Sequence, residues 1–132
     1  MNEYLEDRYP QPALAYPDPS RRARARQWED YGDNNFLSPA EGIFIHDKGW
    51  RHFETEQLEN FRQRILESLA FVEKALEAKE YLVDSFTYAD ISFAPRLIIL
   101  EQLGILLPQN FVNVRAWIGR LKRRPSLQNL EH

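Results

Sequence analysis

Two histidines and an aspartate form the group of side chains in this sequence that comes nearest to a metal site. His46, Asp47 and His52 are close in the chain, and imidazole and carboxylate groups are ordinary zinc ligands. The spacing of six between the histidines does not place both rings on one face of a helix, and no third ligand is apparent. The absence of cysteine excludes thiolate catalysis, disulfides and cysteine-based metal sites. We therefore predict no metal site.

Four arginines, at positions 21, 22, 24 and 26, could form a patch that binds nucleic acid. On a helix they would spread over about half of the circumference, and acidic Glu29, Asp30 and Asp33 follow within two turns. The whole chain has a net charge of −3 from 20 acidic and 17 basic residues, which gives no general attraction to nucleic acid or to an anionic membrane. We interpret the arginines as a solvated helix face and predict no nucleic-acid partner.

The motifs of common catalytic sites are missing from this sequence. It has no nucleophile elbow, no glycine-rich phosphate loop and no acid pair with interpretable spacing. Its 132 residues, 43% hydrophobic and 28% charged, are typical of one soluble globular domain. No apolar run approaches the roughly 20 residues that span a bilayer. We predict no catalytic residue, no membrane partner and a cytoplasmic location.

Helical patterns dominate the chain. Asp18 followed by Pro19 is a favourable helix start, because aspartate can cap the first turn and proline fits its first position. Apolar residues recur every three or four positions from Leu58 to Leu76, which is the pattern of a helix packed on one face. We predict helices over 19–37 or beyond, 55–79 and 110–124, and leave 39–53 undecided because it shows no clear period.

A capped helix start is the most specific local pattern. With Thr87 as the N-cap, its hydroxyl can accept a hydrogen bond from the amide of Asp90, and the Asp90 carboxylate can accept one from the amide of Thr87. Phe86 and Ile91 stand where a hydrophobic staple would close over this capping box. For Thr87 and Asp90 we favour a structural role over a ligand-binding one.

The helix that starts there is apolar nearly all round, so we predict that it forms the buried centre of the domain over about 87–104. Pro95 should kink it near its second turn, and Gly104 should end it. The predicted fold is therefore all-α, a helical bundle around a buried central helix. The predicted organisation is the end of a preceding helix and a proline-rich linker over 1–16, the helical domain over 17–129, and a histidine-tag remnant over 130–132.

Several of these segments together resemble the C-terminal helical domain of glutathione S-transferases. The resemblance covers almost the whole chain in order, and it rests on the segments 4–10, Trp28, 86–91 and 117–126. In that family a thioredoxin-like N-terminal domain supplies the catalytic residue and most of the glutathione site. We therefore expect this chain to be the C-terminal part of a longer protein and to be inactive alone.

The resemblance also implies which residues contact substrates. Asp30 matches a polar residue that in several bacterial members reaches the glutathione held by the neighbouring subunit, and a carboxylate suits its ammonium group. Asn34 and Leu37, about one and two turns further on, would line the same wall. Leu37 stands where some bacterial relatives have a functional histidine, which argues against the beta class.

Two functions follow as expectations. The first is a contribution to the second-substrate pocket and to the subunit contacts of a homodimeric enzyme that uses glutathione as co-substrate on small electrophiles, with no tight glutathione binding by this chain itself. The alternative is a non-catalytic protein-binding module of the same fold, like stringent starvation protein A or the appendages of translation factors. The faces of helices 19–37 and 87–104 would abut the N-terminal domain and, if exposed, would form an apolar patch that promotes self-association.

Overall fold

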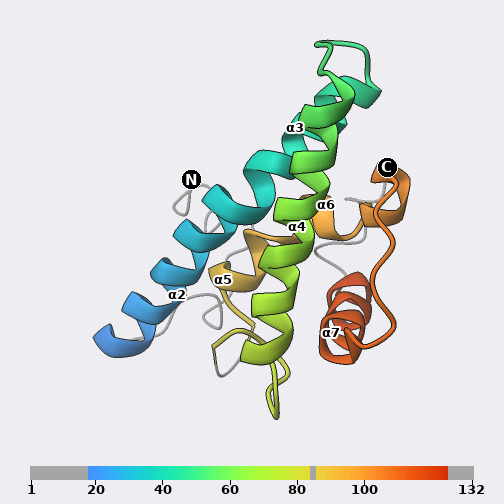
Figure 1. The fold of residues 1–132 in the computed structure, drawn as a ribbon. Helices are drawn as coiled ribbons and strands as arrows, with labels where there is room; N and C mark the ends of the chain where they lie inside the picture. Colours follow the sequence, from blue (N-terminus) through green and yellow to red (C-terminus); the bar gives the residue numbers. More distant parts are fainter. Residues whose placement is uncertain (1–17, 84–85, 125–132) are drawn as a thin grey trace.

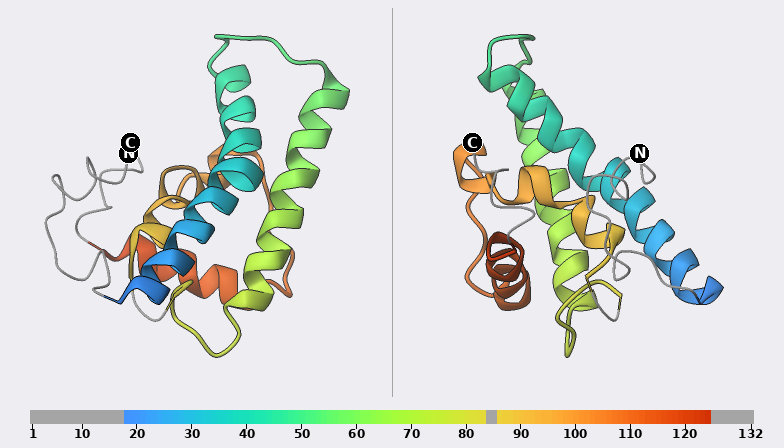
Figure 2. Two further views of the ribbon diagram at one scale, coloured as in Figure 1. Left: turned by 90° about the vertical axis from the view of Figure 1, so that its left-hand side faces the viewer. Right: turned by 180° about the vertical axis from the view of Figure 1, so that it is seen from behind.

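The computed structural model describes residues 18–83 and 86–124, and all regular secondary structure in these residues is helical. A long rod formed by α2, η2 and α3 packs beside the long helix α4, while short helical segments and α7 complete the domain (Figure 1). Figure 2 shows that the far ends of α3 and α4 project beyond the rest of the molecule. The predicted linker over 1–16 and the tag remnant over 130–132 lie outside the described residues.

The undecided segment after residue 38 turns out to be a continuation of the first helix. The α-helix α2 (Pro19–Gly32) passes into a π-helical turn, η2 (Asp33–Leu37), and then into the α-helix α3 (Ser38–Asp47). Asp18 caps the start, since its side chain accepts a hydrogen bond from the amide of Ser20. Pro39 does not end the rod, because it lies in the first turn of α3, just after the π-helical turn changes the hydrogen-bond register.

The helix α4 (Thr55–Ala75) buries the apolar stripe that the sequence shows, including Ile65, Leu69 and Val72. It ends four residues before the predicted boundary, where Leu76 leaves the helix and Ala78 takes a left-handed conformation with a φ of 61°. The rod and α4 approach closely at Gly42. A Cβ atom there would lie 2.6 Å from the Phe61 ring, so the approach requires glycine.

The central helix predicted over 87–104 is not one helix, and this part of the prediction was wrong. The segment forms α5 (Tyr88–Ile91), α6 (Ala94–Leu97) and a 3₁₀-helix η3 (Leu100–Leu103), joined by turns. Pro95 accounts for the first break, because its ring excludes a regular helix through residue 91 and it lies in the first turn of α6. Gly104 ends the segment with a φ of 78°, a conformation that glycine adopts readily.

The buried position of this segment is as predicted. Phe93, Ala94 and Leu97 are 0–1% exposed and belong to the main hydrophobic core. The last helix, α7 (Val112–Lys122), packs against α4 and buries Trp117 completely. Phe93 contacts Trp117 in an edge-to-face arrangement with ring centroids 5.4 Å apart, so the centre of the bundle joins α7 through aromatic packing.

Candidate functional site

Asp30 and Asn34, two residues of the predicted substrate wall, are neighbours on the rod. Both are exposed, and the side-chain amide of Asn34 donates a hydrogen bond of 2.9 Å to the backbone carbonyl of Asp30. Leu37 is half-buried and packs against the hydrophobic core. The structure therefore presents a polar pair to solvent and turns the third predicted residue toward the interior.

A second acidic residue, Asp33, adds negative charge to this wall beside Asp30. Asp33 is the next acidic residue, and partial burial together with the nearby Asp30 carboxylate raises the pKa of its carboxyl group. Two neighbouring carboxylates make a more favourable environment for a cationic group than one does. A primary ammonium is the kind of group that this pair would attract.

The π-helical turn beneath this wall is held by Arg64, a residue that the sequence did not single out. The amide of Ser38 donates to the carbonyl of Asp33, five residues earlier. In this register the carbonyl of Asn34 would pair with position 39, where proline has no N–H. Arg64 of α4 instead donates from its guanidinium group to the Asn34 carbonyl at 2.9 Å. A side chain from another helix thus replaces the missing donor.

The capped helix start belongs to α5, which packs against α2, and it is organised around Asp90. One carboxylate oxygen of Asp90 accepts a hydrogen bond from the amide of Thr87 at 3.0 Å, and the Thr87 hydroxyl accepts one from the amide of Ala89 at 3.2 Å. The other oxygen of Asp90 accepts from the amide of Leu82 at 3.1 Å and from the indole N–H of Trp117 at 3.0 Å. Asp90 therefore joins the helix start to a preceding connection and to α7.

Burial decides the electrostatics of Asp90. Its side chain is completely inaccessible to solvent, and this desolvation raises the pKa of the carboxyl group to about 6, although hydrogen bonds from Thr87, Leu82 and Trp117 and the charge of Arg124 act in the opposite direction. A carboxylate surrounded by protein on every side cannot contact a ligand. The geometry supports a structural role for this residue.

Phe86 and Ile91, the predicted staple residues, are both buried beside the cap. The guanidinium carbon of Arg124 lies 3.7 Å from the centroid of the Phe86 ring, and Tyr81 packs edge-to-face against the same ring at 5.7 Å. A direct contact between Phe86 and Ile91 stays a prediction. The cap is thus covered by an aromatic and cationic layer.

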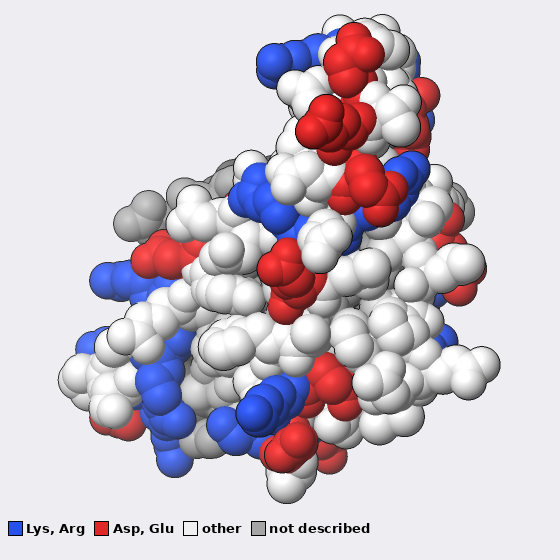
Figure 3. All heavy atoms as spheres, viewed as in Figure 1, with Lys and Arg blue, Asp and Glu red and all other residues white. Residues whose placement is uncertain are grey.

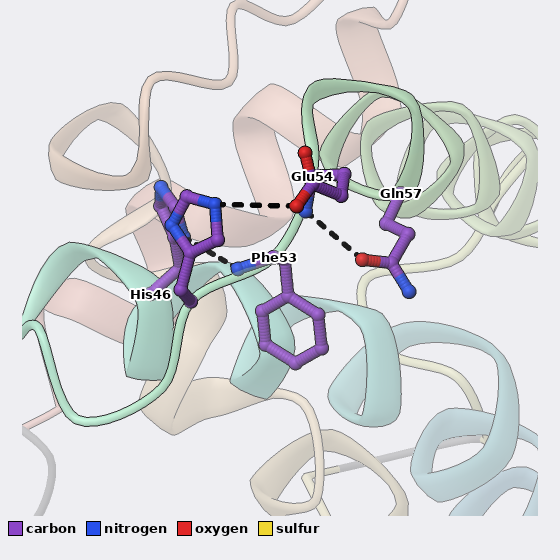
Figure 4. Close-up of polar contacts among 5 residues, drawn as sticks. His46, Phe53, Glu54 and Gln57 are labelled. Carbon is purple, nitrogen blue, oxygen red and sulfur yellow. Dashed lines mark hydrogen bonds and ion pairs between the residues drawn. The ribbon is translucent and has the colours of Figure 1, made fainter.

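The histidines at the tip of the α3–α4 hairpin have local structural partners (Figure 4). The Nδ1 atom of His46 accepts a hydrogen bond of 3.1 Å from the amide of Phe53, and His52 lies 3.6 Å from the Glu54 carboxylate. The Gln57 side chain accepts from the amide of Glu54, which caps the start of α4. Among residues 18–83 and 86–124, no group of three or more His, Cys, Asp or Glu residues could hold a metal ion.

A family model confirms the resemblance drawn from the sequence. The model of the glutathione S-transferase C-terminal domain matches residues 36–125, which include α3, α4, the Thr87 cap and α7. This chain belongs to the glutathione S-transferase family. The match lies entirely in the helical domain of the family, in agreement with the all-helical structure.

Individual members of the glutathione S-transferase family show the same relationship. FtsZ-localized protein A of Caulobacter vibrioides is 25% identical over 130 residues, which cover 93% of this chain and 57% of that protein. Maleylacetoacetate isomerase of Pseudomonas aeruginosa is 31% identical over 116 residues, covering 80% of this chain and 50% of the isomerase. This glutathione S-transferase domain thus spans about half the length of the curated relatives that it matches.

The solved structures of the glutathione S-transferase family carry the same fold. The theta class enzyme of Xanthomonas axonopodis pv. citri, solved with glutathione bound, aligns with a TM-score of 0.79 over 96% of this chain and 67% of that one, at 24% sequence identity. Glutathione is therefore a ligand within this family. In the part of this glutathione S-transferase domain that the structure describes, no helix is long and apolar enough to cross a membrane.

Proposed function

We propose that this domain supplies part of the second-substrate pocket and of the subunit contacts in a glutathione-dependent enzyme that conjugates or reduces small electrophiles. The observation that carries the proposal is the exposed pair of Asp30 and Asn34 on a rod whose fold and family are those of a glutathione transferase. The proposal extends to a homodimeric, cytoplasmic whole protein with glutathione as its co-substrate.

The chemistry of the wall supports this role. An exposed carboxylate beside a second acidic residue can form a charge-assisted hydrogen bond with the ammonium group of glutathione. The carbonyl of Asn34 is held by Arg64 and its amide by the carbonyl of Asp30, so the backbone beneath the wall is fixed before a ligand arrives. Leu37, half-buried one turn further on, would give the pocket an apolar side.

The proposal includes inactivity of this chain by itself. In the family, the catalytic residue and most of the glutathione contacts belong to the thioredoxin-like domain, and this chain matches only about half the length of its relatives. A single wall residue contributes one charge-assisted hydrogen bond, which is worth about 1.5–3 kcal/mol and is far too little for tight binding by itself. We expect the isolated chain to bind glutathione no tighter than about 10 mM.

The test compares this chain alone with the same chain placed behind the thioredoxin-like domain of a related transferase. Conjugation of glutathione to 1-chloro-2,4-dinitrobenzene should appear only in the fusion. In the fusion, Asp30→Ala should raise the KM for glutathione about tenfold, because one charge-assisted hydrogen bond is lost. Glu59→Ala, an exposed position on α4, serves as the matched control. An unchanged KM in the Asp30→Ala fusion would remove the assigned role of that residue.

A second candidate function is a protein-binding module without glutathione chemistry. The observation that favours it is the similarity over 93% of this chain to a relative whose name, FtsZ-localized protein A, describes localisation with another protein and no enzymatic activity. The two candidates differ in the fusion experiment. A folded fusion that binds glutathione but turns over no electrophile would favour the binding module.

A further inference from the structure

A groove of about 310 Å³ lies between α7 and the chain that runs from α6 through η3 to residue 107. Figures 1 and 2 show that η3 and α7 lie on the opposite side of α4 from α2, so the groove is separate from the wall formed by Asp30 and Asn34. Its floor includes the buried side chains of Ile98 and Ile105. A cavity of this size with an apolar floor falls within the range of ordinary small-molecule sites.

One of the residues of α7 that line the groove is a glycine. Gly119 lines the groove, and a Cβ atom built there would meet only the end of the Arg123 side chain, at an ordinary distance of 3.6 Å. Glycine is a poor residue for the middle of a helix, and the close packing that requires Gly42 is absent at Gly119. Gly119 therefore adds backbone but no side chain to the wall that α7 gives the groove.

The charged residues of the groove are arranged along the same face of α7. Arg115 and Lys122 are seven positions apart, so they lie two turns from each other with Gly119 between them. The Arg115 guanidinium group is fixed by donating to the carbonyls of Leu107 at 3.3 Å and Pro108 at 3.0 Å. In the described part of the chain, the side chain of Lys122 makes no hydrogen bond or ion pair. Glu101 on the facing wall leaves an excess of one positive charge.

Leu106 gives the groove an apolar lip, because 82% of the surface of this residue is exposed. The space-filling view shows few charged side chains on the right-hand side of the molecule, over α7 and the connection that precedes it (Figure 3). An apolar ligand would cover this surface, while a single negative charge would complement the cations at the edge of the groove.

We propose that this groove binds a free medium-chain aliphatic carboxylate, with the alkyl chain over Gly119 and the carboxylate at Lys122. The alkyl chain would bury the apolar floor and lip, and the carboxylate would pair with an ammonium group that has no partner among the described residues. The site is independent of the proposed glutathione-dependent function, since none of its lining residues belongs to the rod.

The first experiment is a titration of the full chain with octanoate, followed by backbone amide chemical shifts. We expect saturable shifts confined to residues 97–107 and 115–122, with a Kd of about 1 mM. Octanol, which has the same chain and no charge, should bind about fivefold more weakly, because an exposed ion pair contributes modestly. Shifts centred on the aromatic cluster of half-buried Trp28 and Tyr31 and exposed Phe71, or no saturable shifts, would overturn the proposal.

Two substitutions at one position then test the groove itself. Gly119→Leu should fill it and weaken octanoate binding about tenfold or more, whereas Gly119→Ala should leave binding within about twofold of the wild type. Both variants should melt above the wild type, because alanine and leucine are better helix formers than glycine, so a loss of binding cannot come from unfolding. Equal binding by the two variants would contradict the proposed position of the alkyl chain.

A charge reversal tests the position of the carboxylate. Lys122→Glu should weaken octanoate binding about fivefold and leave octanol binding within about twofold, because only the charged ligand loses a partner. Glu101→Gln should move octanoate binding in the opposite direction, by a smaller factor. Parallel changes for octanoate and octanol would show that the cation at Lys122 does not recognise the ligand.

Discussion

The starts of α5 and α7 are both stabilised by a carboxylate, but the carboxylates come from different distances along the chain. At α5 the carboxylate belongs to Asp90, three residues after the N-cap Thr87. At α7 the N-cap Phe111 has no side-chain hydrogen bond, and Glu73 of α4 accepts from the amides of Asn113 at 3.0 Å and Val114 at 2.8 Å. The first cap is local, whereas the second forms only when two helices pack.

The two caps also differ in what surrounds the carboxylate. Asp90 is completely buried and satisfies three donors from three separate segments, so its removal leaves three polar groups without a partner in the interior. Glu73 is half-buried, so water can replace some of the hydrogen bonds that its carboxylate accepts from the first turn of α7. The comparison shows that Asp90, a capping residue predicted from local sequence, also holds distant segments together. We expect it to contribute more to stability than Glu73, which caps a helix from another part of the chain.

Asp90→Ala should give the largest loss of stability. We expect the free energy of unfolding to fall by about 3–5 kcal/mol, because three buried N–H groups lose their acceptor, and the melting temperature to fall by about 10 °C or more. Thermal and urea unfolding followed by circular dichroism would measure the loss. A decrease below about 1 kcal/mol would reduce Asp90 to an ordinary surface cap.

The pH dependence of stability sharpens the account of Asp90. The pKa of this carboxyl group is raised from 3.8 to about 6, so between these values the native state binds more protons than the unfolded state. The free energy of unfolding that this group contributes should therefore fall as pH rises from about 4 to about 6, by at most about 3 kcal/mol. The measurement is urea unfolding of the wild type and Asp90→Asn at several pH values. A difference between the two proteins that does not change with pH would contradict the raised pKa.

Glu73→Ala tests the remote cap and should cost about 1–2 kcal/mol, because two helix N–H groups lose their acceptor but remain near solvent. Glu67→Ala, at an exposed position on the same helix, is the matched control and should stay within about 0.5 kcal/mol of the wild type. Urea unfolding is again the measurement. If the loss in Glu73→Ala equalled that in Asp90→Ala, burial would not be what separates the two caps.

Thr87→Ala should give the smallest of these effects, about 1 kcal/mol, because it removes only the hydroxyl acceptor that serves the amides of Ala89 and Asp90 and leaves the three bonds of the Asp90 carboxylate in place. Thr87→Ser keeps the hydroxyl group and should recover most of this loss. The two variants can be compared by their melting temperatures. A serine variant as unstable as the alanine variant would assign the effect to the methyl group of this buried threonine.

Regular periodicity made much of the fold predictable. The stripe from Leu58 to Leu76 identified α4, and the all-helical class and the glutathione S-transferase family are both confirmed. The single helix over 87–104 was wrong, since an apolar sequence fits a buried helix and a series of short turns equally well. Pro39 and Pro95 show why, because one lies within a continuous rod and the other beside a break. At Pro39, the guanidinium group of Arg64 on α4 donates to the carbonyl of Asn34, a contact that only the packing of two helices provides.

In the candidate site, too, some features follow from the sequence and others depend on tertiary packing. Asp30 and Asn34 are one turn apart, so their proximity follows from the helix itself, whereas the half-buried position of Leu37 depends on what packs against the rod. Arg64 could not be singled out, since many arginines in the chain could in principle reach a backbone carbonyl. The missing N–H of Pro39 was a usable signal that some donor was needed.

The sequence by itself determined the class of the fold, the family and the contacts within about one helical turn, because backbone geometry fixes the distances between such residues. The tertiary structure decided the contacts between Asp90 and Trp117, Glu73 and α7, and Arg64 and the π-helical turn. Each joins residues 27 to 41 positions apart. Only the packing of the hydrophobic faces brings these groups together. From the sequence alone, many other pairs of polar residues could equally well be predicted to meet.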